Sequence, residues 1–153
     1  MTGSAIRAAI AARLKEAGIA GAWVGPEDTG TLGARKGAYV LMIRLDKPQP
    51  VGAGRTKAGH LPAGTYLYAG SAHGAGGLAA RLRRHFRKDK AVHWHIDRLT
   101  LPAGDLAAFA VPGGNECQLV GQLLQVEGIE IALEGFGSSD CRTCSSHLLV
   151  VRS

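Results

Sequence analysis

The sequence predicts an α/β (α+β) domain in which a small mixed or antiparallel three-stranded sheet is flanked by helices. Short apolar segments rich in β-branched and aromatic residues, such as AYVLMIRL and TYLYA, alternate with longer segments whose apolar residues recur every three or four positions. The chain has 153 residues and 46% hydrophobic content, enough to bury one core. We therefore expect a single domain over residues 1–153.

The first helix is predicted over residues 4–17, where Ala, Ile and Leu alternate with charged residues and Gly18 follows as a C-cap. A polar, glycine-rich loop is expected over 26–36, and the first strand over 38–45. Residues 46–64 contain three prolines and four glycines, which predicts a long loop or an irregular hairpin.

The second strand is predicted over residues 65–69. Its tyrosines, Tyr66 and Tyr68, share one face because side chains alternate along a strand. The turn GSAHGAGG follows, and it lacks the GK[ST] ending of a phosphate-binding P-loop. We interpret it as a tight strand-to-helix connection, in which glycine supplies positive φ.

A helix is expected next, over residues 77–88. Its apolar stripe consists of Leu78, Leu82 and Phe86. The segment HWHID at 93–97 predicts a short helix or strand, and residues 106–111 a third strand. Asn115 is a good N-cap, with Gln118 in the capping-box position, for a helix over 116–125. The C-terminal LLVV is strand-like.

Positive charge is concentrated on the helix over 77–88. The chain has 18 Lys+Arg and 12 Asp+Glu, hence a net charge of +6, and six of the cations lie between residues 78 and 90. Clustering of this kind favours nucleic-acid contact more strongly than net charge alone. The predicted nucleic-acid-binding residues are Arg83, Arg84, Arg87, Lys88 and Lys90. An ordinary solvated face is the alternative for Arg83, Arg87 and Lys90.

The sequence favours a cytoplasmic protein without membrane contact. No apolar run approaches the roughly 18 residues of a membrane span, and the charged N-terminus has no secretory apolar segment. The three cysteines, Cys117, Cys141 and Cys144, are an odd number that argues against a disulfide framework and for free thiols or a metal.

A zinc site at Cys141, Cys144 and His147, completed by Cys117, is possible from the ligand types. The spacing lacks the usual second ligand pair, and buried free cysteines are common. We therefore expect structural thiols. A metal-binding structural protein built around these cysteines is a third possibility, behind the two functions given below.

An ordered series of motifs resembles the GIY-YIG nuclease superfamily. GAY at 37–39 resembles its first motif, YAG at 68–70 its second, and GLAARLRRHF its arginine-bearing helix. The most similar branch is the small prokaryotic domain found alone or fused to endonuclease III-type glycosylases, whose motif series appears almost throughout residues 68–148. The resemblance covers 36–150, which leaves 1–35 as an N-terminal helical extension. Ala38 and Ala69 replace the family's isoleucines.

The resemblance implies a GIY-YIG-like fold and a metal-dependent DNA endonuclease that hydrolyses phosphodiester bonds. It would be structure-selective or weakly sequence-specific, in DNA repair or recombination, with DNA as partner; no protein partner is identified. The alternative is a non-catalytic nucleic-acid-binding module that kept the fold. The implied catalytic residues are Tyr39, Tyr68, Arg81, His85 and Glu116, with Glu116 binding Mg²⁺ or Mn²⁺.

The chemistry of these residue types agrees with that function. An arginine fork suits a phosphate at any working pH, and one carboxylate suffices to anchor Mg²⁺, which keeps several waters. Other roles remain open at this stage. Glu116 could simply favour its helix start, the tyrosines could be packing residues, and His85 could brace its helix. One of His93 and His95 could reach the site, but the segment Trp94-His95-Ile96-Asp97 could instead form a structural His–Asp contact.

Overall fold

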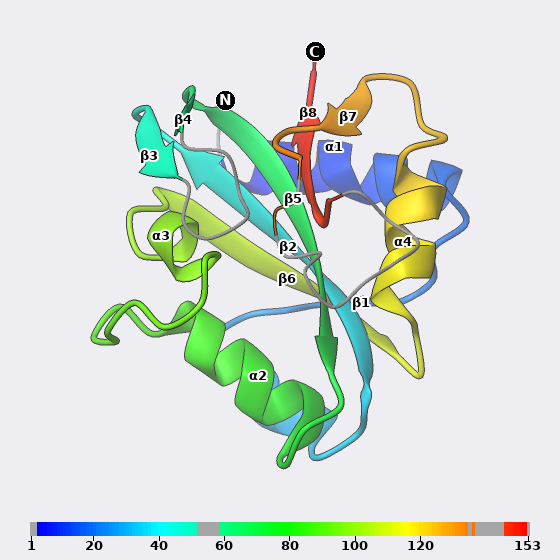
Figure 1. The fold of residues 1–153 in the computed structure, drawn as a ribbon. Coiled ribbons are helices and arrows are strands. Elements are labelled where there is room, and N and C mark those ends of the chain that lie inside the picture. The colour runs from blue at the N-terminus through cyan, green and yellow to red at the C-terminus, as the bar shows by residue number, and fades with distance from the viewer. Residues whose placement is uncertain (1–2, 52–58, 135, 137–145, 153) are drawn as a thin grey trace.

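The computed structural model describes residues 3–51, 59–134, 136 and 146–152. These residues form a mixed α+β fold with a six-stranded antiparallel sheet in the order β1-β6-β2-β5-β8-β7 and a separate β3-β4 pair (Figure 1). Antiparallel strands flanked by helices confirm the coarse prediction. The prediction of three strands was wrong, because the main sheet has six.

The elements, in chain order, are α1 (Gly3–Glu16), β1 (Ala22–Val24), the 3-10 helix η1 (Thr29–Leu32), β2 (Gly37–Leu45), β3 (Gln49–Val51), β4 (Gly59–Leu61), β5 (Gly64–Ala72), α2 (Gly77–Phe86), α3 (Asp97–Thr100), β6 (Asp105–Pro112), α4 (Glu116–Leu123), β7 (Ile129–Ile131) and β8 (Leu148–Val151).

The strands that the sequence did not reveal are short. β1 and β7 have three residues each, too few to display a two-residue period. Each exists because a longer neighbour offers hydrogen-bonding partners: β1 pairs with β6, and β7 with β8. Similarly, β5 extends past the expected residue 69 to Ala72, because Gly70, Ser71 and Ala72 pair with β2 across from Tyr39, Ala38 and Gly37.

The sheet is buried on both faces by helices, and β2 shows this most clearly. Tyr39, Leu41 and Ile43 point into a core shared with α2 and α3. The alternating residues, such as Val40 and Met42, point into a second core shared with α1 and α4. Figure 1 shows α2 and α3 together on one side of the sheet and α1 behind it. Helices on both faces explain why β2 reads as a continuous apolar run.

The N-terminal segment is part of this packing. Ile6, Ile10 and Leu14 of α1 are buried in the second core, and β1 extends the sheet. In the described part of residues 1–35, α1 and β1 are thus built into the same cores and sheet as the remainder of the chain.

Two helices end two residues earlier than predicted. α2 stops at Phe86 rather than 88, because Arg87 takes an extended conformation with φ −69° and ψ 136°. α4 stops at Leu123 rather than 125. The predicted N-cap is confirmed, since Asn115 Oδ1 accepts the backbone N–H of Gln118 at 3.0 Å.

A membrane-spanning helix is not found among the described residues, where every helix is too short or too polar to cross a bilayer.

Candidate active site

The face of the sheet covered by α2 carries a pocket of about 200 Å³. Four of the five predicted catalytic side chains line it: Tyr39 from β2, Tyr68 from β5, and Arg81 and His85 from α2. The remaining lining residues are His93, Trp94, His95, Ile96 and Phe136. Residues separated by more than fifty positions in the sequence therefore share one cavity.

A buried hydrogen bond joins Tyr39 and His85 at the base of this pocket. Tyr39 Oη lies 2.6 Å from His85 Nε2, and both side chains are almost fully buried. The Tyr39 ring lies over Gly70, its cross-strand partner, where an added Cβ would overlap the phenol Cζ and Oη. The glycine of the YAG segment therefore leaves the space that the tyrosine ring occupies.

Both members of this pair are neutral at neutral pH. Burial raises the pKa of Tyr39 well above its usual value; Tyr68 and Glu116 raise it further, while the charge and hydrogen bond of Arg81 oppose the rise. Burial lowers the pKa of His85 to about 3, and the cations of Lys90 and Arg81 lower it as well. A neutral imidazole Nε2 can accept the Tyr39 hydroxyl proton in a hydrogen bond.

Tyr68 lies on the same face, two residues before Gly70. Burial raises the pKa of Tyr68 to about 12, and Arg81 opposes this rise while Glu116 and Asp97 add to it. Its ring contacts Phe136 edge to face, with centroids 6.2 Å apart. Tyr68 is thus a neutral hydroxyl at the pocket wall.

Glu116 opens α4, directly after its N-cap. Its charge raises the pKa values of Tyr39, Tyr68 and His147, so the carboxylate lies within electrostatic reach of all three. Glu116 Oε2 is buried and has no hydrogen-bond partner in the described part of the chain. A buried carboxylate oxygen left without a donor fits a hard divalent cation, which takes oxygen ligands.

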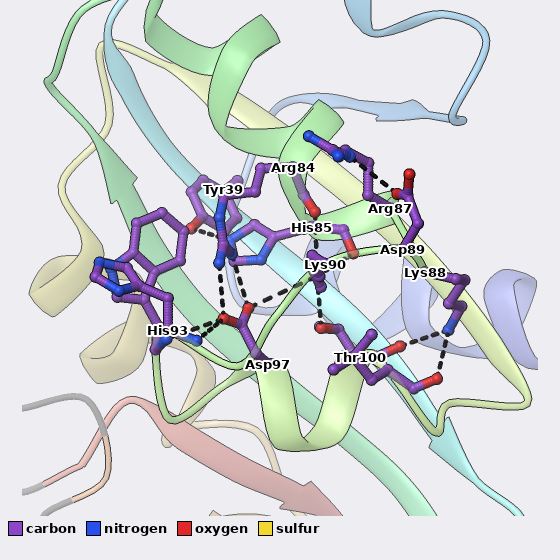
Figure 2. A network of polar contacts seen from close by, with 12 residues as sticks. Tyr39, Arg84, His85, Arg87, Lys88, Asp89, Lys90, His93, Asp97 and Thr100 are labelled. Carbon is purple, nitrogen blue, oxygen red and sulfur yellow. Dashed lines mark hydrogen bonds and ion pairs between the residues drawn. The ribbon is translucent and has the colours of Figure 1, made fainter.

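A buried carboxylate, Asp97, organises the segment beside the pocket through cation partners that the sequence did not indicate (Figure 2). Asp97 is fully buried and accepts Arg84 Nη1 at 2.8 Å and Nη2 at 2.9 Å. It also accepts the backbone N–H groups of His93 and Trp94, each at 2.9 Å, and lies 3.6 Å from Lys90 Nζ.

Asp97 is ionised despite its burial. Burial raises its pKa, but the hydrogen bonds from Arg84 and from the amides of Trp94 and His93 outweigh burial and hold the pKa well below its usual value. The network fixes the segment between α2 and α3. The only indication of this network in the sequence was the WHID segment, which suggested a contact between a histidine and Asp97. In the structure, Asp97 accepts a hydrogen bond from the backbone N–H of His93.

Trp94 was not predicted as a site residue from the sequence, but it contacts Arg81, the predicted catalytic arginine. The Arg81 guanidinium lies 4.4 Å from the Trp94 ring centroid, and that of Arg84 lies 4.1 Å from it. The His85 ring is 5.9 Å from the same indole. Cation–π contacts of this kind hold a guanidinium against an aromatic surface. Trp94 therefore connects the Asp97 network to Arg81.

His93 and His95 both line the pocket, each packed against an aromatic ring. The His93 ring lies 5.6 Å from that of Trp94, and the His95 ring lies 6.1 Å from that of Phe136.

The basic residues predicted to bind nucleic acid divide into two groups. Arg83 and Arg87 are exposed, and Arg87 pairs with the exposed Asp89 at 3.1 Å. Arg84, by contrast, is bound to Asp97. The Lys90 side chain is only 4% exposed and donates to the Arg84 and His85 carbonyls and to Thr100 Oγ1.

The interpretation of Lys90 as part of a solvated, nucleic-acid-facing stripe is therefore corrected. Lys88 is likewise engaged, since its Nζ donates to the carbonyls of Thr100, Leu101 and Ala103 at the end of α3. The reason is the early end of α2. The extended Arg87 turns the chain toward α3, so that Lys88 Nζ reaches these carbonyls while the Lys88 side chain stays exposed.

The amides that open α2 are occupied. The N–H groups of Leu78 and Ala79 donate to the carbonyls of Arg35 and Gly33, and those of Gly77 and Ala80 to nearby turn carbonyls. This agrees with the interpretation of GSAHGAGG as a strand-to-helix connection, because no amide is left in this first turn to cradle a phosphate.

The cysteine predictions are partly outside the described residues, where Cys141 and Cys144 lie. Cys117 is disulfide-bonded, which corrects the expectation of a free thiol there. An odd cysteine count excludes only a framework in which every cysteine is paired. Cys117 Sγ also lies 3.6 Å from His147 Nε2, beside Glu116.

Comparison with known protein families gives a match over most of the chain. The model of a family described as a domain of unknown function, DUF123, matches residues 38–153. No curated protein and no solved structure matches the chain significantly.

Proposed function

The chain belongs to the DUF123 family, and from the chemistry of its pocket we propose that it is a metal-dependent DNA endonuclease that hydrolyses phosphodiester bonds. The proposal includes a GIY-YIG-like architecture, which the motif resemblance implies. The observation that carries it is the convergence of Tyr39, His85, Tyr68 and Arg81 in one pocket, with the unpartnered Glu116 carboxylate oxygen within electrostatic reach.

The Tyr39–His85 pair supports a role in accepting a proton from the attacking water. In the His85 tautomer that carries its proton on Nδ1, the Tyr39 hydroxyl donates to His85 Nε2, and a lone pair of the hydroxyl oxygen remains available to a water in the pocket. As the water attacks phosphorus, its proton passes to Tyr39 Oη while the Tyr39 proton passes to His85. This relay avoids a phenolate, which the raised pKa of Tyr39 disfavours. Burial and the cations of Lys90 and Arg81 hold the pKa of His85 at about 3, so the relay also requires the bound anionic phosphate, whose negative charge raises that pKa.

Arg81 supplies fixed positive charge for the phosphate. Its guanidinium lies beside Trp94 and lines the pocket with the Tyr39 and Tyr68 hydroxyls. Arginine stays charged at any working pH and matches two phosphate oxygens with its planar fork. Tyr68, neutral with a pKa of about 12, can donate a hydrogen bond to water or phosphate.

Glu116 is the residue that would hold the divalent cation. Mg²⁺ or Mn²⁺ held there would supply Lewis-acid stabilisation of phosphate oxygens. The residues of this chain orient the phosphate, and Asp97, through Arg84 and Trp94, keeps Arg81 in place.

The exposed cations suggest weak sequence preference. Arg83 of α2 and Arg87, directly after α2, are exposed to solvent, where phosphate is the natural contact. Phosphate contacts position a nucleic acid without reading bases. We therefore infer a structure-selective or weakly specific enzyme, suited to repair or recombination.

Glu116→Gln tests the proposal, with Glu127→Gln, a change at an exposed glutamate outside the pocket, as the matched control. Wild type and the control should nick or cut DNA with Mg²⁺ or Mn²⁺, and EDTA should stop both. Glu116→Gln should fold normally and bind DNA at least as well, but lose cleavage. Arg81→Ala should lower turnover about a hundredfold with a modest loss of binding.

Wild-type protein that binds DNA yet cleaves no branched, flapped, nicked or abasic substrate with either metal would favour the non-catalytic binding module. Equal cleavage by Glu116→Gln and wild type would remove Glu116 from the site.

A further inference from the structure

A second hollow, of about 330 Å³, lies next to the active-site pocket. Arg81 and Trp94 line both cavities, so these two residues form the boundary between them. Arg84 also borders the second hollow. The reacting groups Tyr39 and His85 line only the first. Whatever binds the second hollow is therefore a direct neighbour of a phosphate held by Arg81.

The floor of this hollow has no side chain larger than a methyl group. It consists of Ala72, Gly74, Ala75, Gly77 and Ala80, at the end of β5, the following turn and the first turn of α2. A Cβ added to Gly74 would meet no heavy atom within 4 Å, so open space lies beside that backbone. A floor of this kind admits close approach of a flat or ring-shaped ligand.

The polar groups around the hollow limit what it can bind. Arg84 is committed to Asp97, and the amides that open α2 already donate to protein carbonyls. Arg81 has no carboxylate within ion-pair distance among the described residues, and it faces both cavities. The hollow therefore offers one positive charge at its boundary, the Trp94 ring and guanidinium planes as walls, and an apolar floor. This combination suits a sugar and base whose phosphate reaches Arg81.

We propose that this hollow binds the nucleotide adjacent to the scissile phosphate, and that this nucleotide is unpaired. The inference rests on the proposed function and adds the class of substrate. A hollow of this size holds one nucleotide, whereas a base pair brings a second base from the opposite strand. The preferred DNA thus has a single-stranded residue beside the cut, as in a flap, a fork or a frayed end.

Filling the hollow tests this without touching the reacting groups. Ala80→Leu and Gly74→Leu place larger side chains on its floor, and neither residue belongs to the active-site pocket. Ala8→Leu, at an exposed position of α1, is the matched control for the alanine substitution. Trp23→Phe in every protein leaves Trp94 as the sole tryptophan, so that its fluorescence reports occupation of the hollow.

Binding is measured in the presence of EDTA, with a flapped DNA, the same flap carrying an abasic residue at the junction, and a fully paired duplex of equal length. The parent protein should bind the flap about tenfold more tightly than the duplex, the size of one stacked base, and the flap should change Trp94 fluorescence. Ala80→Leu and Gly74→Leu should abolish the preference and leave duplex affinity within about twofold. The abasic flap should behave as the duplex does.

Equal affinity of the parent protein for flap and duplex, or a preference that survives both substitutions, would overturn the proposal. Absence of DNA binding by the parent protein would also overturn it. The measurement is of binding without metal, so it separates the two proposals. If the substitutions abolish the preference for the flap but the parent protein never cleaves DNA, the nucleotide-binding role of the hollow is supported and only the nuclease activity is contradicted.

Discussion

Truncation of Asp97 to alanine should be the most destabilising single change at the wall of the pocket. The substitution leaves Arg84, whose side chain is 25% exposed, and Lys90, which is 4% exposed, without their carboxylate. It also removes the acceptor of two backbone amides. Breaking a buried ion pair by removing one partner costs about 3–5 kcal/mol, because a charge stays buried and uncompensated.

That loss is a large part of the roughly 5–15 kcal/mol that holds a domain of this size folded. For a chain of about 150 residues, each kcal/mol lowers Tm by about 2–4 °C, so a drop of roughly 6–20 °C is expected. Urea unfolding at pH 7, followed by circular dichroism, measures the free energy directly.

Asp89→Ala is the matched control, since Asp89 also accepts an arginine of this region, Arg87, but at the surface. It should cause no measurable change, because solvent screens an exposed pair. Combining Asp97→Ala with Lys90→Met should recover part of the lost stability by removing the stranded ammonium. If Asp97→Ala is as stable as Asp89→Ala, the buried network does not hold this wall and the account of Arg81 positioning through Trp94 is wrong.

Three further predictions follow from the same site. Gly70→Ala should cost about 1–3 kcal/mol and displace Tyr39, because the new Cβ would overlap its phenol; a stability like that of wild type in urea unfolding would contradict this. His85 should make the protein less stable as pH falls from 6.5 toward 3, by up to about 1.4 kcal/mol per pH unit, because the unfolded chain binds a proton that the folded protein, with its pKa of about 3, does not. The pKa of His147 is lowered as well, so His147 adds to the same pH dependence. The test therefore compares wild type with His85→Gln, and measures for each the slope of the unfolding free energy against pH between pH 6.5 and 4.5. Equal slopes would refute the assignment to His85. Replacing Arg83 and Arg87 with alanine should reduce the magnitude of the slope of the logarithm of the DNA-binding constant against the logarithm of salt concentration by about 2. Turnover on saturating DNA should not change. An unaltered slope would show that these arginines do not contact DNA.

Much of the fold followed from local patterns in the sequence. The long strands β2 and β6, the helices α1, α2 and α4, and the Asn115 cap were all recognisable, because periodicity and capping are properties of neighbouring residues. The extra strands β1 and β7 were not, since three residues form a strand only where a neighbouring strand offers its unpaired N–H and C=O groups.

The site divides in the same way. The sequence by itself indicated Tyr39, Tyr68, Arg81 and His85, because their types and order resemble a known motif series. The tertiary structure alone revealed that Asp97 is buried against Arg84 and Lys90 and that Trp94 lies on Arg81. It also decided that the Lys90 ammonium is buried against the Arg84 and His85 carbonyls, and that Lys88, although exposed, donates to the carbonyls at the end of α3. The sequence determines which side chains carry a charge. Whether a charged group contacts water, a carboxylate or an aromatic ring depends on where the chain turns after α2, and packing against α3 determines that turn.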